Sequence, residues 1–212
     1  MLDNLKEYWY LWLILVLVLI LTIFVWYKAL KASANRNSRR RMEIEKIDRH
    51  RRLRKDFAEI THSLIAQASD QDLLEGTTEH LMEALEKSKD DLAYFHALQE
   101  EWKYIYTLTF IKDLAAGDSV RRFYRECGEV LGKYTASALS AMRQPMLSAF
   151  FAKATSVYDE NDMTASADMQ TIARLEDEFR KLTENTDFDR IGADFIRFNS
   201  QVFIAGAHIS EV

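Results

Sequence analysis

The feature that most constrains this chain is a run of twenty residues, 8–27, that contains no charged side chain. A helix of this length is about 30 Å long, which matches the hydrocarbon core of a bilayer. Tryptophan and tyrosine, whose rings favour the headgroup level, mark both ends of the run. These aromatic residues are Trp9, Tyr10, Trp12, Trp26 and Tyr27. The run therefore predicts a membrane-spanning helix, because a buried soluble helix seldom continues this far without a polar face.

A cleaved signal peptide is the alternative interpretation of the same run. Residues 32–35 read Ala-Ser-Ala-Asn and offer a small-residue cleavage site. However, the segment before the run carries Lys6 against Asp3 and Glu7, and lysines follow the run where a cleavage region is uncharged. The run also lacks the small-xxx-small spacing of tightly paired membrane helices. We therefore expect a single anchor that stays in the mature chain.

A strongly basic stretch, residues 28–55, follows the apolar run, with twelve Lys and Arg against three Asp and Glu. Lys6 is the only Lys or Arg among the seven residues before the run. Because Lys and Arg beside a span stay on the cytoplasmic side, the pattern predicts a single-pass protein of the inner or plasma membrane. Its N-terminus should lie outside and its C-terminal body in the cytoplasm. Basic residues close to the span are also expected to contact the anionic leaflet. They are Lys28, Lys31, Arg36, Arg39, Arg40 and Arg41.

The remaining body, residues 56–212, is acidic, with 28 Asp and Glu against 15 Lys and Arg. Direct binding to the phosphates of DNA or RNA is therefore disfavoured, whereas a basic or nucleic-acid-binding protein would be attracted. Cys127 is the only cysteine, which excludes an intrachain disulfide and fits a reducing compartment.

Six Gly and one Pro in 212 residues argue against a turn-rich β fold, and the apolar spacing predicts an all-α protein. Four segments are expected. Residues 1–7 form a short extracytoplasmic N-terminus, 8–27 the transmembrane helix, 28–55 a basic helical stalk and 56–212 a compact multi-helix domain.

Local signals place several helices of this domain. Ser38 is expected to cap a helix that runs through the stalk into the domain. Ser69 and Asp72 form a capping box that opens another helix. Residues 98–117 are apolar on most sides and predict a central, deeply buried helix that ends near Gly117.

In the second half of the domain, Gly128 and Gly132 are expected to bracket a turn, and Pro145 to separate two helices. A further amphipathic helix is expected within residues 166–182, and one closing helix through Ile191, Phe195, Phe198 and Val202.

Three stretches resemble a bacterial all-helical domain family described as DNA-mimic-protein-like. They read LQEEWKYIYTLTFIKDLAAGDSVRRFYREC, ASALSAM followed after two residues by PMLSAFFAKATSVYDE, and FIRFNSQVFI. The resemblance covers residues 64–204, with Ala-Gly-Asp at 116–118 where that family has Asn-Gly-Gly. It implies an acidic surface that imitates nucleic-acid phosphate toward a DNA-binding protein.

Side chains that could carry chemistry are few, and no phosphate-binding loop, nucleophile elbow or kinase signature is present. Glu59 with His62, and His80 with Glu83, have the i, i+3 spacing of half a helical di-iron site. Three arginines in one short segment are candidates for an anion or partner contact. They are Arg121, Arg122 and Arg125, and they precede Cys127, which we expect to be buried and unreactive.

The sequence thus predicts a membrane-anchored, non-enzymatic interaction module that binds a basic protein partner, without catalytic residues, cofactor or metal. A metal-dependent helical enzyme using the Glu59, His62, His80 and Glu83 side chains is one alternative. A coiled-coil scaffold is another, although it would put His50 and Arg54 at seam positions.

Overall fold

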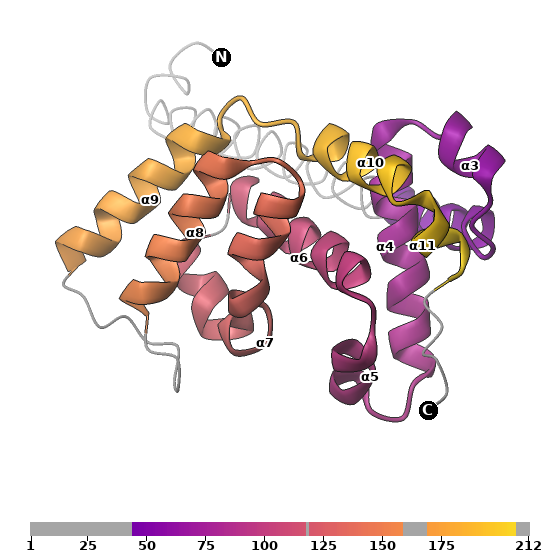
Figure 1. Ribbon diagram of the computed structural model, residues 1–212, viewed down its shortest axis with the longest axis horizontal. Helices are drawn as coiled ribbons and strands as arrows, with labels where there is room; N and C mark the ends of the chain where they lie inside the picture. Colours follow the sequence, from indigo (N-terminus) through magenta and orange to yellow (C-terminus); the bar gives the residue numbers. More distant parts are fainter. Residues whose placement is uncertain (1–43, 118, 159–168, 207–212) are drawn as a thin grey trace, which may run out of the picture. The chain divides into compact units, whose positions relative to one another are not determined.

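The computed structural model describes residues 44–117, 119–158 and 169–206 (Figure 1). The predicted segments 1–7 and 8–27, with the aromatic residues of the span, lie outside the described residues, as do the expected leaflet contacts from Lys28 to Arg41. Among the helices that the structure does describe, none has the length and apolar character needed to cross a bilayer. The chain divides into two compact units, Met1–Arg49 and His50–Val212, and the second is called the domain below.

Every regular element in the described part of the chain is a helix, which confirms the all-α prediction for that part. The first covers residues 44–56. The others are α3 (His62–Gln67), α4 (Asp70–Lys87), α5 (Asp91–Ala97), α6 (Glu100–Ala115), α7 (Val120–Ala141), α8 (Pro145–Val157), α9 (Met169–Thr183), α10 (Phe188–Phe198) and α11 (Ser200–Ile204).

Short polar side chains fix where several helices begin, because they accept the N–H groups that the first turn leaves without partners. Ser69 accepts from the N–H of Asp72, which confirms the predicted cap, and its hydroxyl donates to Asp72 Oδ2 at 2.9 Å. Asp90, Ser119 and Asp187 cap α5, α7 and α10 in the same way. Pro145 occupies the first turn of α8, so the predicted break is also confirmed.

The predicted central helix is α6, which packs against α4, α7 and α10 and lies between α4 and α7 in Figure 1. Its buried apolar residues occupy almost every side of the helix. They are Trp102, Ile105, Leu108, Ile111 and Leu114. The helix ends at Ala115, and Gly117 follows with a φ of 145°, a conformation that favours glycine.

Three predicted boundaries differ from the structure. The turn expected at Gly128 and Gly132 is absent, since α7 continues through both glycines. The apolar face keeps the helix continuous, because Phe123, Leu131 and Leu139 are buried before, between and after the glycines.

The long helix expected from Ser38 into the domain is interrupted over residues 57–61 within the described part. The cause is burial, because Phe57 and Ile60 both turn into the core and Thr61 caps the next helix. The Phe57 carbonyl accepts a hydrogen bond of 2.9 Å from His80 Nδ1, so the turn leaves this carbonyl satisfied.

The closing segment is also two helices, α10 and α11, and not one. Asn199 interrupts it, because its side-chain amide and its backbone N–H both donate to the carbonyl of Phe195, each at 3.0 Å. The interruption changes which face is buried. Phe203 packs in the core, whereas Phe198, expected there, is 79% exposed.

Two glycines test how closely these helices pack. A Cβ added at Gly76 would lie 2.3 Å from Cδ2 of the buried Phe57 ring, so Gly76→Ala should cost about 1–3 kcal/mol of unfolding free energy through overpacking. Gly132→Ala is the matched control, because its Cβ would meet the Tyr124 ring at an ordinary 3.5 Å. It should gain about 0.5–1 kcal/mol. Denaturant unfolding of the full chain in mild detergent measures both, and equal stabilities would contradict the packing.

A second test concerns Tyr124 and Tyr158, whose rings stack with centroids 4.4 Å apart and planes 9° apart. Burial raises the pKa of both phenols to about 12. The Tyr124 hydroxyl lies 2.8 Å from Thr155 Oγ1, whereas the buried Tyr158 hydroxyl has no hydrogen-bond partner among the described residues.

Because the unfolded chain releases these protons near pH 10 and the folded domain near pH 12, the folded state binds more protons in between. The free energy of unfolding should therefore fall as pH rises from about 10 to 12. In a titration followed by tyrosinate absorbance, part of the tyrosine signal should appear at a higher pH than in the unfolded chain. Tyr158→Phe should leave neutral-pH stability within about 1 kcal/mol of the native chain and shrink the alkaline loss. A variant with an unchanged alkaline profile would contradict this assignment.

Candidate functional site

A cluster of ion pairs, here called the Arg54 clasp, joins the end of the basic stretch to α4. Arg54 Nε donates to Glu79 Oε2 at 2.7 Å, and its two terminal nitrogens donate to the oxygens of Glu86 at 2.9 and 2.8 Å. His50 Nδ1 donates to Glu79 Oε1 at 2.6 Å. These contacts raise the pKa of Arg54 and lower that of Glu86.

The clasp arises from helical spacing. Glu79 and Glu86 are two turns apart on α4 and present carboxylates on one face, which suits the forked guanidinium of Arg54. Leu53, beside Arg54, is buried, so the last turn of helix 44–56 is fixed by packing as well as by charge. Arg54 and Phe57 thus contact α4, whereas a coiled coil would use them in a seam between chains.

The candidate metal ligands do not come together. Glu59 lies in the 57–61 turn and His62 is the first residue of α3, so the expectation that they share a helix face is wrong. Glu83 accepts from Lys87 at 2.5 Å, which lowers its pKa. The His80 ring, bonded to the Phe57 carbonyl, stacks on Trp102 with centroids 5.7 Å apart. Within the described ranges, no group of three or more His, Cys, Asp and Glu is placed to hold a metal ion.

The candidate arginines lie on the first two turns of α7. The N–H groups of Val120 and Arg121, which would face an anion there, donate to the carboxylate of Glu176 on α9 at 3.1 and 3.2 Å. Arg122 and Arg125 both pair with Glu126, at 3.0 and 3.4 Å. An internal carboxylate thus occupies the anion position at this end of α7.

The predicted burial of Cys127 is partial. The thiol is half-buried and lines a small hollow of about 170 Å³ with Phe110, Phe123 and Arg122. Burial raises the pKa of the thiol, and the nearby Glu126 carboxylate raises it further. Little reactive thiolate therefore forms at neutral pH.

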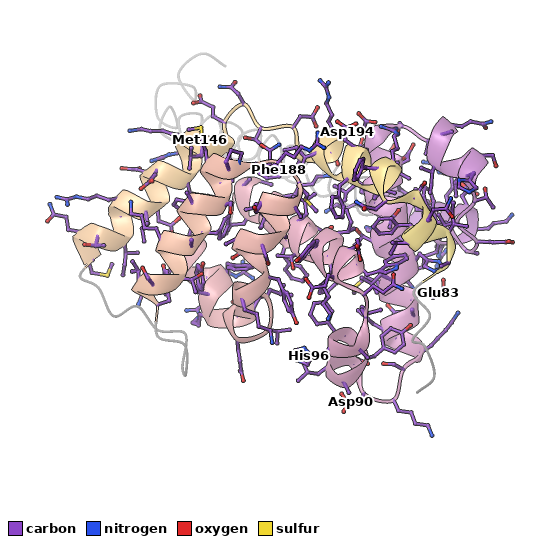
Figure 2. The ribbon with its side chains drawn as sticks, viewed as in Figure 1. Glu83, Asp90, His96, Met146, Phe188 and Asp194 are labelled. Carbon is purple, nitrogen blue, oxygen red and sulfur yellow. The ribbon has the colours of Figure 1, made fainter. Side chains whose placement is uncertain are left out.

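A hollow of about 510 Å³ lies between α10 and the turn that joins α7 to α8. Its apolar walls come from Met142 at the end of α7 and from residues of α10 at helical spacing, with Arg143 and Asp194 as its charged side chains. The α10 residues are Ile191, Phe195 and Phe198. In Figure 2, Asp194 lies on α10, and Met146, at the start of α8, lies well to its left.

Arg143 has an unusual backbone, with a φ of 59°. Its N–H donates to the carbonyl of Ser140 at 3.0 Å, and the N–H of Gln144 donates to the carbonyl of Leu139 at 2.8 Å. These two bonds define a Schellman motif, in which the position of Arg143 is usually glycine. An arginine in this left-handed conformation costs about 1–2 kcal/mol. Its side chain lies over the Phe198 ring, 5.7 Å from the centroid.

Sequence patterns alone did not single out this hollow. The available signal was the segment Met-Arg-Gln-Pro at 142–145, where a helix ends before a proline without the expected Gly or Asn. The exposure of Phe198 had no such signal, because it depends on the break at Asn199.

Comparisons with protein-family models, with curated proteins and with solved structures found no match to the chain. The similarity to the DNA-mimic-like family accordingly stays a prediction.

Replacing the central residue of the clasp tests its role in the domain. Arg54→Met should lower the thermal midpoint of the full chain, because it leaves the mostly buried Glu79 carboxylate without its arginine partner. Lys87→Met is the control, because it removes an exposed pair within one helix turn, which contributes little. The difference in thermal midpoint between the two variants should become smaller in high salt. Equal midpoints in low salt would show that the clasp does not hold helix 44–56 to α4.

Proposed function

We propose that this chain is a single-span membrane protein with its N-terminus outside, and that its cytoplasmic helical domain binds a basic protein partner near the inner leaflet. The anchor, the basic stalk and the orientation rest on the sequence of residues 1–55. In this proposal the domain is an interaction module and carries out no reaction.

The observation that carries the proposal is how the domain uses its charges. Nine of the nineteen Lys and Arg side chains of the domain are found in ion pairs with its own carboxylates. Lys112 pairs with Glu75 and Asp189, and Arg197 with Asp70. Exposed carboxylates remain for which no ion pair is found among the described residues. Asp56, Glu59, Glu129 and Glu184 are among them.

A surface with excess carboxylate attracts a basic protein over distances of about a Debye length and repels nucleic acid. The same excess is repelled by an anionic leaflet, while the basic stretch before it is attracted. The partner would therefore meet its acidic surface a short distance from the membrane. A nucleic-acid-binding protein has the required charge, in agreement with the expected DNA-mimic resemblance.

The proposal is tested with the full chain in membrane vesicles. Inverted vesicles should expose the domain to protease, whereas right-side-out vesicles should protect it. Inverted vesicles should also retain basic proteins from a native lysate at low ionic strength and release them in high salt.

The matched variant carries Asp56→Asn, Glu59→Gln, Glu129→Gln and Glu184→Gln, which removes four exposed carboxylates without touching an ion pair of the described domain. It should retain the same proteins several-fold less well, with an unchanged thermal midpoint. Protease protection in the opposite vesicles would contradict the topology. Retention that is insensitive to salt and to the variant would contradict the acidic surface.

A further inference from the structure

We propose that one face of the domain contacts the surface of a bilayer that contains anionic phospholipid. This face, called the α8–α10 face, consists of Arg143, Met146, Arg190 and Phe198. The inference rests on the proposed function in one respect, since the membrane anchor keeps the domain close to the lipid. It adds a second, peripheral contact to the span.

The apolar part of this face projects from the surface. Phe198 and Met146 are 79% and 70% exposed, the highest values among the large hydrophobic side chains of the described residues. Arg143 connects them, because its guanidinium covers the Phe198 ring and Met146 follows it by three residues at the start of α8. A projecting aromatic ring and a flexible thioether suit insertion at the boundary between headgroups and acyl chains.

The cationic part of the face is open to a phosphate. Arg143 is exposed, and the contact found for its guanidinium among the described residues is the Phe198 ring. Glycine would fit the backbone at this position at lower cost, so the arginine is better explained by what its side chain binds. Arg190, 72% exposed, adds a second guanidinium on α10.

The acids of α10 oppose this attraction less than the acidity of the whole domain suggests. Asp187 accepts the N–H of Arg190 as the helix cap. Asp189 pairs with Lys112 at 2.6 Å, and Asp194 lies 3.7 Å from Arg197 and 3.8 Å from Arg190. Asp189 and Asp194 are each paired with a cation and Asp187 keeps its charge, so Arg143 is the open guanidinium of this face that complements an anionic surface.

A bilayer fits these features better than a protein does. The largest apolar side chains of the face stand out of the surface, whereas a groove for a partner helix would recess them. An anchored domain also meets its own bilayer at high effective concentration, so a weak contact is sufficient.

The test uses the full chain in nanodiscs, with an environment-sensitive fluorophore on Ser140→Cys in a Cys127→Ser background. Ser140 is exposed in the last turn of α7, beside the face. Emission should shift to the blue in nanodiscs of phosphatidylcholine with phosphatidylglycerol and not in phosphatidylcholine alone, and high salt should reverse the shift.

Two variants of the labelled chain should lose the shift. Arg143→Gly removes the guanidinium and relieves the backbone, so it should lose the shift while its thermal midpoint rises. Phe198→Ser removes the exposed ring. Leu92→Ser, at an exposed leucine of α5, is the control and should keep the shift.

Three results would overturn the proposal: equal emission in both lipids, variants that keep the shift, or a shift that requires added soluble protein, which would identify a protein-binding face. Co-elution with nanodiscs reports the anchor independently. If the labelled chain does not incorporate into nanodiscs, the proposed function fails. Flotation of the same chain with phosphatidylglycerol vesicles then tests lipid binding by the α8–α10 face without the anchor, and a chain that does not float would contradict that binding.

Discussion

Desolvation of α6 is the constraint on which the rest of the domain depends. Trp102, Ile105 and Leu108 are almost completely buried, so the helices around α6 must present apolar faces to it. α10 approaches closely through Gly192, where a Cβ would lie 2.7 Å from Leu74 on α4 and 3.0 Å from Leu108 on α6. Lys112, near the end of α6, reaches the edge of the core and pairs there with Asp189 of α10.

The same arrangement distributes the charges. Ion pairs between elements distant in sequence, such as Arg54 with Glu79 and Arg197 with Asp70, hold the ends of helices in place. Each such pair takes up one cation and one carboxylate of a domain that has 28 Asp and Glu against 19 Lys and Arg. The net negative charge is therefore unchanged by pairing, and the acidic surface in the proposed function reflects the composition of the domain.

The proposed contacts with partner and membrane use opposite features of one domain. Exposed carboxylates would attract a basic protein, whereas the α8–α10 face combines an open guanidinium with projecting apolar side chains. Arg143 illustrates why such a face needs the folded domain. The end of α7 sets the backbone conformation of Arg143, whereas the ring that its side chain covers belongs to α10. Residues 143 and 198 are far apart in the sequence, so only the folded domain brings them together.

The sequence by itself determined the all-α class of the described domain, the Ser69 cap, the break at Pro145 and the burial of α6, because these follow from local chemistry and from apolar spacing along one helix. Tertiary structure decided what local pattern could not. Gly128 and Gly132 stay within α7 because both sides of them are buried, and Phe57 ends helix 44–56 because it packs against Gly76. Arg54 binds α4, and Phe198 turns outward after α10 ends at Asn199. These outcomes depend on contacts between residues far apart in the chain, and the energy of such contacts outweighs intrinsic helix propensity, which is small for each residue.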